Sequence, residues 1–182
     1  MNIKALIRER RTIHAYQHED CISLSEVKEI IATACWAPNH HLSQPWHFYL
    51  LGKETINDIC QLNRAFLSNN RSVDEVERKM KRWLTIPGWI IVTCDQSEDA
   101  LRYQEDYAAC ACAMQNIMLQ LWDKGMGSKW STGALTREQA FYECISVDSQ
   151  LEKVIGILWY GKPDVIPRSK RKDASQFIIE LP

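Results

Sequence analysis

The sequence feature that most constrains the fold is a long helical pattern that runs from about Glu98 to Lys124. From Tyr107 onward its residues are apolar on almost every side, and Gly125 stands where a helix C-cap is expected. A helix without a wide polar face must be covered by other parts of the protein. Its run of small residues, Ala108 to Ala113, would let a second helix approach closely. The sequence does not separate a partner inside the chain from one across a dimer.

Shorter periodic segments predict the remaining elements. Apolar residues at helical spacing predict helices that begin near Ile3, Ser23, Ile56, Ser72 and Thr136. Ser23, Ser72 and Thr136 are each followed three residues later by Glu or Gln, which is the capping-box pattern. Short apolar or alternating runs predict strands at Trp46–Leu51, Trp89–Cys94, Ser128–Ser131, Lys153–Tyr160 and Gln176–Leu181. The last of these strands needs a sheet edge to pair with.

The element order indicates one α+β domain that spans residues 1–182. A chain of 182 residues with 46% hydrophobic residues is long enough for one substantial core and too short for two comfortable domains. Helices with few strands between them do not match a regular βαβ alternation. The chain also lacks the glycine-rich motifs of dinucleotide-binding and P-loop folds.

Charge and cysteine usage narrow the function classes. With 22 basic and 23 acidic residues, the net charge of −1 argues against nucleic-acid binding by the whole molecule. A local alternative is the basic run Arg168–Lys172, but no aromatic residues are interleaved with it. No segment has the pattern of a signal peptide or a membrane span, and the seven cysteines, none in a C-x-x-C pair, are expected to be mostly reduced core residues. We therefore expect a soluble, cytoplasmic protein.

Four loop segments carry groups that suit a phosphorylated planar ligand. In the first, Arg10, Arg11 and Thr12 place two guanidinium groups and a hydroxyl together, with His14 close by. Because a helix C-terminus precedes them, its dipole opposes anion binding, and the arginines must supply the attraction. The alternative is that both arginines only cap the helix.

The other three segments also have structural alternatives. Residues 38–46 combine two prolines with Asn39, His40 and His41; the adjacent histidines diverge and lack a third ligand, so we expect no metal there. In residues 125–133, glycines free the backbone and Trp130 could flank a planar ring, or the segment is only a helix-to-strand turn. The basic run near Arg171 could equally be a solvated surface.

Taken in this order, these segments resemble the nitroreductase family of flavin reductases. The resemblance rests on Arg-Arg-Thr near the start, Gln-Pro-Trp after Ala37-Pro38, and Glu105-Asp106 at the start of the alanine-rich helix. It continues with Gly-Met-Gly-Ser after that helix and with Ile155-Gly156 and Tyr-Gly-Lys-Pro near the end. These pieces are weak singly and fairly specific in this order. They span nearly the whole chain.

The resemblance implies a fold, a cofactor and an activity. The fold is α+β, with a central mixed or antiparallel sheet flanked by helices, in an intertwined homodimer whose C-terminal strands are exchanged. The cofactor is FMN, bound at two shared sites, and NADH or NADPH is the co-substrate. Hydride passes from the nicotinamide through flavin N5 to a small electrophilic acceptor such as a nitroaromatic, a quinone or an enone, by a ping-pong mechanism. No side chain needs to act as the catalytic acid or base.

The resemblance also implies roles for individual residues. Arg10, Arg11, Thr12 and Arg171 would hold the phosphate and ribityl groups of FMN. Trp130, Ser131 and Thr132 of the same subunit would line the flavin ring, and Asn39 and His40 would contact it from the partner subunit. His14 stands where many relatives have a lysine or arginine, so FMN affinity is expected to depend on pH near its reference pKa of about 6.5. The rival from another class is a flavin-binding sensor or carrier module without turnover.

Overall fold

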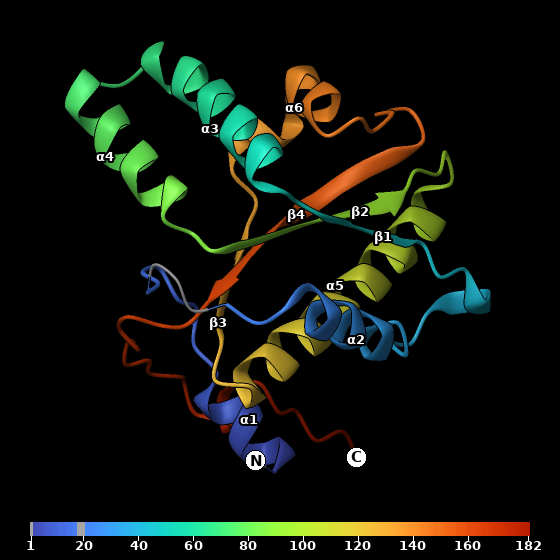
Figure 1. Cartoon of the computed structure of the whole chain (residues 1–182). Helices are drawn as coiled ribbons and strands as arrows, with labels where there is room; N and C mark the ends of the chain where they lie inside the picture. Colours follow the sequence, from blue (N-terminus) through green and yellow to red (C-terminus); the bar gives the residue numbers. More distant parts are fainter. Residues whose placement is uncertain (1, 18–20) are drawn as a thin grey trace.

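The computed structural model describes residues 2–17 and 21–182 and contains a four-stranded antiparallel sheet (Figure 1). The strand order is β1 (Trp46–Leu50), β2 (Gly88–Asp95), β4 (Glu152–Gly161) and β3 (Gly127–Ser131). All three strand pairs are antiparallel, and the one parallel pairing among the described residues is the bridge between Thr12 and Ser128. The α+β class is confirmed, and of the two expected sheet types the antiparallel one is present.

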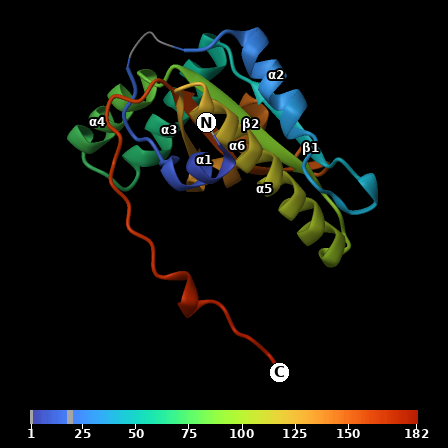
Figure 2. The ribbon, with the colours of Figure 1, turned by 90° about the horizontal axis from the view of Figure 1, so that it is seen from below.

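Two layers of helices cover the two faces of this sheet (Figures 1 and 2). One layer contains α3 (Lys53–Ser68), α4 (Val73–Leu84) and α6 (Gln139–Cys144), and the other contains α2 (Leu24–Ala34) and α5 (Ala100–Asp123). Side chains of β2 alternate between the layers, because Trp89 and Ile91 join the first core cluster while Ile90 and Val92 join the second. The sheet is therefore buried on both faces.

Short elements complete the chain. Helix α1 (Ile3–Glu9) contacts α5 and has no buried residue, and three single 3₁₀ turns are η1 (His40–Leu42), η2 (Ala134–Arg137) and η3 (Ala174–Gln176). In the part of the chain that the structure describes, no helix combines the length and apolarity needed to cross a membrane.

The predictions from the sequence agree best with the structure at the helix ends. Ser23 and Ser72 both form complete capping boxes, with Glu26 and Glu75 returning the hydrogen bond. After α5, Gly125 adopts a φ of 76° and donates its N–H to the Trp122 carbonyl oxygen, while Met126 N–H donates to Leu121 over 2.8 Å. This pair of bonds is a Schellman motif, so the predicted glycine cap is confirmed.

The third predicted cap is wrong. Thr136 lies in η2, and its Oγ1 donates a 2.9 Å hydrogen bond back to the Gly133 carbonyl oxygen. Helix α6 begins at Gln139, and Glu138 at its N-cap makes no side-chain capping bond. A threonine hydroxyl can donate to a nearby backbone carbonyl oxygen instead of accepting from the N–H groups at a helix start, and Thr136 makes the first kind of bond.

Helix α5 is only partly covered by its own chain. Its inner face buries eight residues, including Asp106, Met114 and Ile117, whereas Ala108 and Cys112 on the opposite side are exposed. The expectation that the whole helix is buried is therefore met on one face alone. The cysteine prediction needs a similar correction, because Cys60, Cys94 and Cys110 are buried but Cys21 and Cys112 are exposed.

The C-terminal segment forms no strand within the single chain. After β4 the chain leaves the body of the protein and ends in an extended tail interrupted by η3 (Figure 2). Its apolar side chains are exposed, among them Phe177, Ile178, Ile179 and Leu181. The predicted strand Gln176–Leu181 is thus absent here, because it has no edge of its own sheet beside it. Pairing with a second copy stays a prediction.

Candidate functional site

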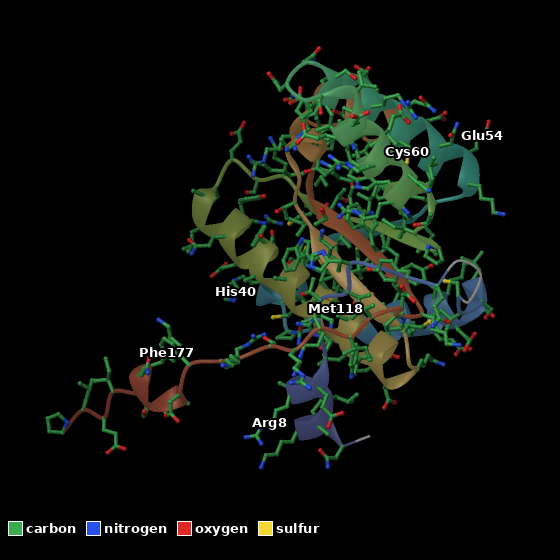
Figure 3. All side chains as sticks on the ribbon, turned by 90° about the vertical axis from the view of Figure 1, so that its left-hand side faces the viewer. Arg8, His40, Glu54, Cys60, Met118 and Phe177 are labelled. Atoms are coloured by element: carbon green, nitrogen blue, oxygen red, sulfur yellow. The ribbon has the colours of Figure 1, made fainter. Side chains whose placement is uncertain are left out.

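The adjacent residues Arg10 and Arg11 and the distant Arg171 line one pocket at the base of α1. Arg10 and Arg11 come from the end of α1, and Arg171 comes from the tail after β4; together with Ser169 they line a cavity of about 400 Å³. Figure 3 shows Arg8 on the same helix beside this part of the chain. The structure therefore brings together the three arginines to which the resemblance assigns the phosphate and ribityl groups.

The electrostatics of this pocket favour an anion. Burial lowers the pKa of Arg10, and the positive charges of Arg171 and Arg11 lower it further. Within the described residues none of these three arginines forms an ion pair with a carboxylate. Arg11 instead donates from Nη1 to the carbonyl oxygens of Arg8, at 2.6 Å, and Arg10, at 2.9 Å. These two bonds agree with the helix-capping alternative for Arg11, while the mutual repulsion of the three charges is left uncompensated.

Thr12 and His14 flank the edge strand β3. Ile13 between them donates its N–H to the Ser128 carbonyl oxygen over 3.0 Å, and its side chain lies against Gly127. A Cβ at Gly127 would lie 2.3 Å from Ile13 Cγ1, so only glycine allows this close approach. The segment therefore joins the arginine pocket to the start of β3.

His14 has different electrostatic neighbours from the arginines. Its pKa is lowered by burial first and then by the charges of Lys129 and Arg82. Lys129 lies 4.9 Å from the ring centroid of Trp159, in the core cluster of the α3, α4 and α6 layer. The sequence grouped His14 with the phosphate residues, and it did not single out Arg82. The basic residues of α4 have the pattern of an ordinary solvated helix face, so no local signal marked it.

Trp130 is fixed against the neighbouring strand. Its Nε1 donates a 3.2 Å hydrogen bond to the Ile155 carbonyl oxygen, and its ring lies over Gly156, where a Cβ would come within 2.3 Å of Nε1. Ser131 pairs with Ile157 at the end of β3, and the exposed Thr132 follows. The three residues predicted to line the flavin ring therefore form one short, rigid stretch at the end of the edge strand.

Asn39 and His40 lie on the separate turn η1. Asn39 organises this turn, because its Oδ1 accepts from Gln44 N–H at 3.0 Å and its Nδ2 donates to the Ala37 carbonyl oxygen at 3.1 Å. His40 is exposed beside it. In both Figures 1 and 2 the turn lies well away from α1, so one chain does not bring these residues to the arginine pocket.

A buried carboxylate holds η1 against α5. Asp106 is 3% exposed, accepts a 2.6 Å hydrogen bond from Ser43 Oγ, and lies 3.6 Å from Arg102 Nε. The backbone of η1 is strained, with φ values of 52° at His41 and 55° at Leu42. The Ser43–Asp106 bond supplies the tertiary contact that such a turn needs. This gives the Glu105-Asp106 motif a physical role.

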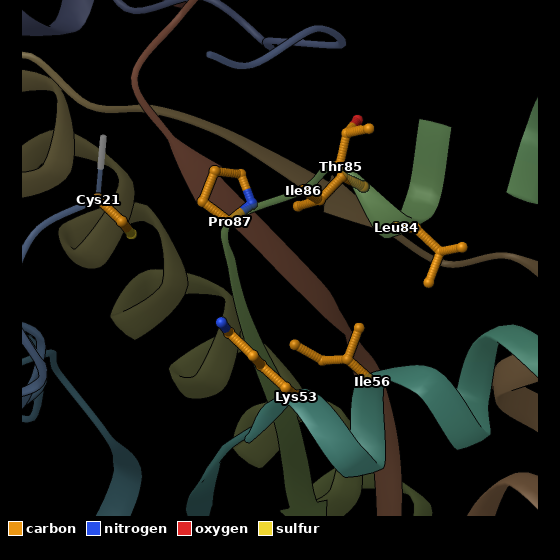
Figure 4. Close-up of a pocket in the computed structure, with 7 residues that line it drawn as sticks. All are labelled: Cys21, Lys53, Ile56, Leu84, Thr85, Ile86 and Pro87. Carbon is orange, nitrogen blue, oxygen red and sulfur yellow. The ribbon is translucent and has the colours of Figure 1, made fainter. Parts of the chain in front are cut away.

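A cavity of about 640 Å³ on another part of the surface holds none of the predicted site residues (Figure 4). It is lined mainly by apolar side chains, together with Lys53 and Cys21. Although Cys21 is exposed as a residue, partial desolvation of its thiol raises its pKa, which leaves the sulfur protonated and a poor nucleophile. Among the described residues no group of three or more His, Cys, Asp or Glu side chains could hold a metal ion.

The comparisons with known proteins agree with the fold. A model of the nitroreductase family, described as "Nitroreductase family", matches residues 7–162. The chain therefore belongs to the nitroreductase family, and that family is the one its sequence motifs resemble.

Individual relatives extend over most of the chain. A Bacillus subtilis (strain 168) protein named "Putative NAD(P)H nitroreductase YfhC" is 26% identical over 174 residues, which are 93% of this chain and 89% of that protein. The crystal structure of a nitroreductase-like family protein from Bacillus cereus superposes with a TM-score of 0.85 at 28% identity, covering 100% of this chain and 96% of the other. A structure titled as a "putative nitroreductase in complex with fmn" from Desulfovibrio desulfuricans gives a TM-score of 0.77 at 21% identity, with 100% and 98% coverage, and so supports the fold alone.

Proposed function

We propose that this chain is an FMN-dependent oxidoreductase that moves hydride from NADH or NADPH to a small electrophilic acceptor by a ping-pong mechanism. The acceptor is a nitroaromatic, a quinone or an enone. The observation that carries the proposal is the pocket formed by Arg10, Arg11 and Arg171, whose lining lacks a carboxylate. The next residue after Arg11, Thr12, bridges to Ser128 of β3, the strand that contains Trp130. Family membership and a relative named as an NAD(P)H nitroreductase support the reaction class.

The residues present fit FMN. Three guanidinium groups with uncompensated charge match a phosphate dianion, which prefers forked N–H donors. Thr12 is exposed beside the pocket and offers a hydroxyl to the ribityl chain. Trp130, anchored on Gly156, gives a fixed aromatic surface for a flat ring. When bound, FMN supplies the hydride-accepting and hydride-donating chemistry that no protein side chain can supply.

Groups of the chain itself would position the flavin ring and polarise it. Backbone N–H groups after Trp130, at Ser131 to Gly133, would donate to the ring and stabilise negative charge that develops there. No acid or base side chain is required. Ser131 is held by its strand pairing and Thr136 Oγ1 ties the following turn to the Gly133 carbonyl oxygen, so these donors are fixed before any ligand binds.

We propose a homodimer that completes two shared sites. The exposed face of α5, the exposed apolar residues Ile3 and Ile7 of α1, and the apolar tail all lack partners within the described chain. Packing two copies through these surfaces would bury them and could bring Asn39 and His40 of one copy to the flavin of the other. The same packing would give the segment 176–181 a sheet edge to pair with. A cytoplasmic location is part of the same proposal.

The visible spectrum of the purified protein, followed by anaerobic titration with NADH and with NADPH, tests the function. We expect a yellow protein whose flavin bleaches with at least one nicotinamide and is reoxidised by a nitroaromatic or a quinone. A flavin that stays oxidised under excess of both nicotinamides would favour the sensor or carrier alternative. A colourless protein that does not take up added FMN would refute the cofactor assignment itself.

A further inference from the structure

Another pocket has Thr132 among its lining residues. It has a volume of about 450 Å³ and combines three tyrosines, Tyr103, Tyr107 and Tyr142, with the two cations Arg137 and Lys153. Its walls come from α5, η2, α6 and the start of β4, so residues far apart in sequence build it. No carboxylate is among its lining residues. Aromatic walls with two cations suit a flat ligand that carries a negative charge.

The two cations in this pocket, Arg137 and Lys153, can bind an anion. Within the described residues neither Arg137 nor Lys153 forms an ion pair. Lys153 Nζ lies 5.3 Å from the ring centroid of Tyr103, which holds the ammonium group at the pocket wall. Both cations are exposed to solvent, so a ligand can reach them, and their attraction for it is moderate.

The tyrosines supply rings and hydroxyl donors. The rings of Tyr103 and Tyr107 lie 6.5 Å apart at an angle of 50°. Burial, together with the neighbouring ionisable groups, raises the pKa of Tyr103 to about 12, so its hydroxyl keeps its proton and can donate to an anion. Tyr142 is buried, and its oxygen accepts from Val154 N–H at 3.0 Å, which leaves the hydroxyl proton available as a donor.

Two residues connect this pocket to the stretch proposed to line the flavin. Thr132 belongs to both, and Ile155, which lines the pocket, accepts the hydrogen bond from the indole of Trp130. A ligand in the pocket would therefore end beside Thr132, next to the position proposed for the ring. This step rests on the proposed function.

We propose that the Tyr103–Lys153 pocket binds an aromatic acid, with Arg137 and Lys153 holding its carboxylate or other anionic group, and that such acids are the preferred acceptors. The test uses the purified full-length protein and two nitroaromatics of similar shape, 4-nitrobenzoate and the neutral 4-nitrobenzyl alcohol. Equilibrium dialysis measures binding of each, and NADH-driven turnover measures kcat and KM.

We expect the wild type to favour 4-nitrobenzoate in both measurements. Arg137→Gln and Lys153→Gln should each weaken its binding and raise its KM about fivefold, the upper range for an exposed charge pair, with kcat little changed. Values for the neutral alcohol should stay within about twofold. Arg78→Gln, which removes an exposed arginine of α4 outside the pocket, is the matched control and should change neither.

Three outcomes would overturn the proposal. They are equal binding of the two nitroaromatics by the wild type, equal weakening of both by the variants, or an effect of the variants on the KM for NADH alone. The dialysis arm does not require flavin turnover. A protein that binds no FMN but binds 4-nitrobenzoate more tightly than the neutral alcohol would refute the proposed function and support the pocket. A flavin-loaded, active protein that binds the two nitroaromatics equally would support the proposed function and refute the pocket.

Discussion

The two helical layers differ in how completely one chain covers them. In the layer of α3, α4 and α6, Trp83, Trp89 and Trp159 pack edge to face, with ring centroids 5.1 to 5.5 Å apart. Each of these rings is buried. In the other layer, α5 leaves Ala108 and Cys112 exposed, and α1 buries no residue at all. The first layer forms its aromatic core within one chain, whereas the second presents the surface proposed to meet a second copy.

This difference indicates that one layer mainly stabilises the fold and the other mainly serves assembly and ligand binding. The closed layer stabilises the sheet through apolar burial, which does not depend on protein concentration. The open layer lies beside the arginine pocket and the tail, and its completion by a second copy would depend on concentration. Substitutions in the first should act on folding, and substitutions in the second on assembly and ligand binding.

The largest effect is expected in the closed layer. Trp89→Ala removes a ring that is 1% exposed and should lower the free energy of unfolding by about 3 to 5 kcal/mol, as for other buried aromatic residues. Urea denaturation followed by circular dichroism measures it. Trp89→Phe is the matched control, because it keeps an aromatic ring and removes an indole N–H that has no hydrogen-bond partner among the described residues. An equal loss in both variants would show that the ring packing is not the main stabilising interaction.

The next effect concerns assembly. Ile179→Asp places a charge on a tail residue that is 83% exposed in the single chain, and it should weaken dimerisation about 100-fold if that residue is buried between two copies. Sedimentation over a range of protein concentrations measures the monomer–dimer equilibrium. Val73→Asp, at a 77% exposed position of the closed layer, should leave it unchanged. A wild type that stays monomeric at high concentration would remove the dimer proposal.

A smaller effect is expected on cofactor affinity. Arg10→Gln and Arg171→Gln should each raise the dissociation constant of FMN about tenfold or more, because each removes a charge-assisted hydrogen bond to the phosphate. Fluorescence quenching of FMN during titration of the apoprotein gives the constant. Riboflavin, which lacks the phosphate, should bind both variants as it binds the wild type. If riboflavin binding falls equally, the arginines stabilise the fold and do not hold a phosphate.

The smallest effect comes from His14. Because its pKa is lowered in the folded protein, the unfolded chain takes up the proton first as pH falls below about 6.5, and folding then loses stability. Above that pH both states are neutral and the effect disappears. We expect Tm to fall between pH 7.5 and 5.5 by about 1 to 2 °C more in the wild type than in His14→Gln. Scanning calorimetry at both values checks this, and identical falls would show that Lys129 and Arg82 do not act on the histidine.

Local chemistry made much of the fold predictable. The capping boxes at Ser23 and Ser72 and the glycine cap at Gly125 need only residues within one or two turns of the helix, so the sequence carries the whole signal. The arginine cluster was also predictable, but only through the order of motifs, because Arg10 and Arg171 meet across 161 positions of the chain.

Long-range contacts decided the rest. The position of His14 near the positive charges of Lys129 and Arg82 depends on how β3 and α4 are placed relative to each other. The pocket of Tyr103, Arg137 and Lys153 exists only where α5, η2 and β4 converge. Sequence periodicity predicted most of the helices and strands, since those preferences are local, but it did not predict the exposed face of α5 or the unpaired tail at residues 176–181. Only the tertiary structure decided which charges and rings meet, because spatial neighbours far apart in the chain leave no local pattern.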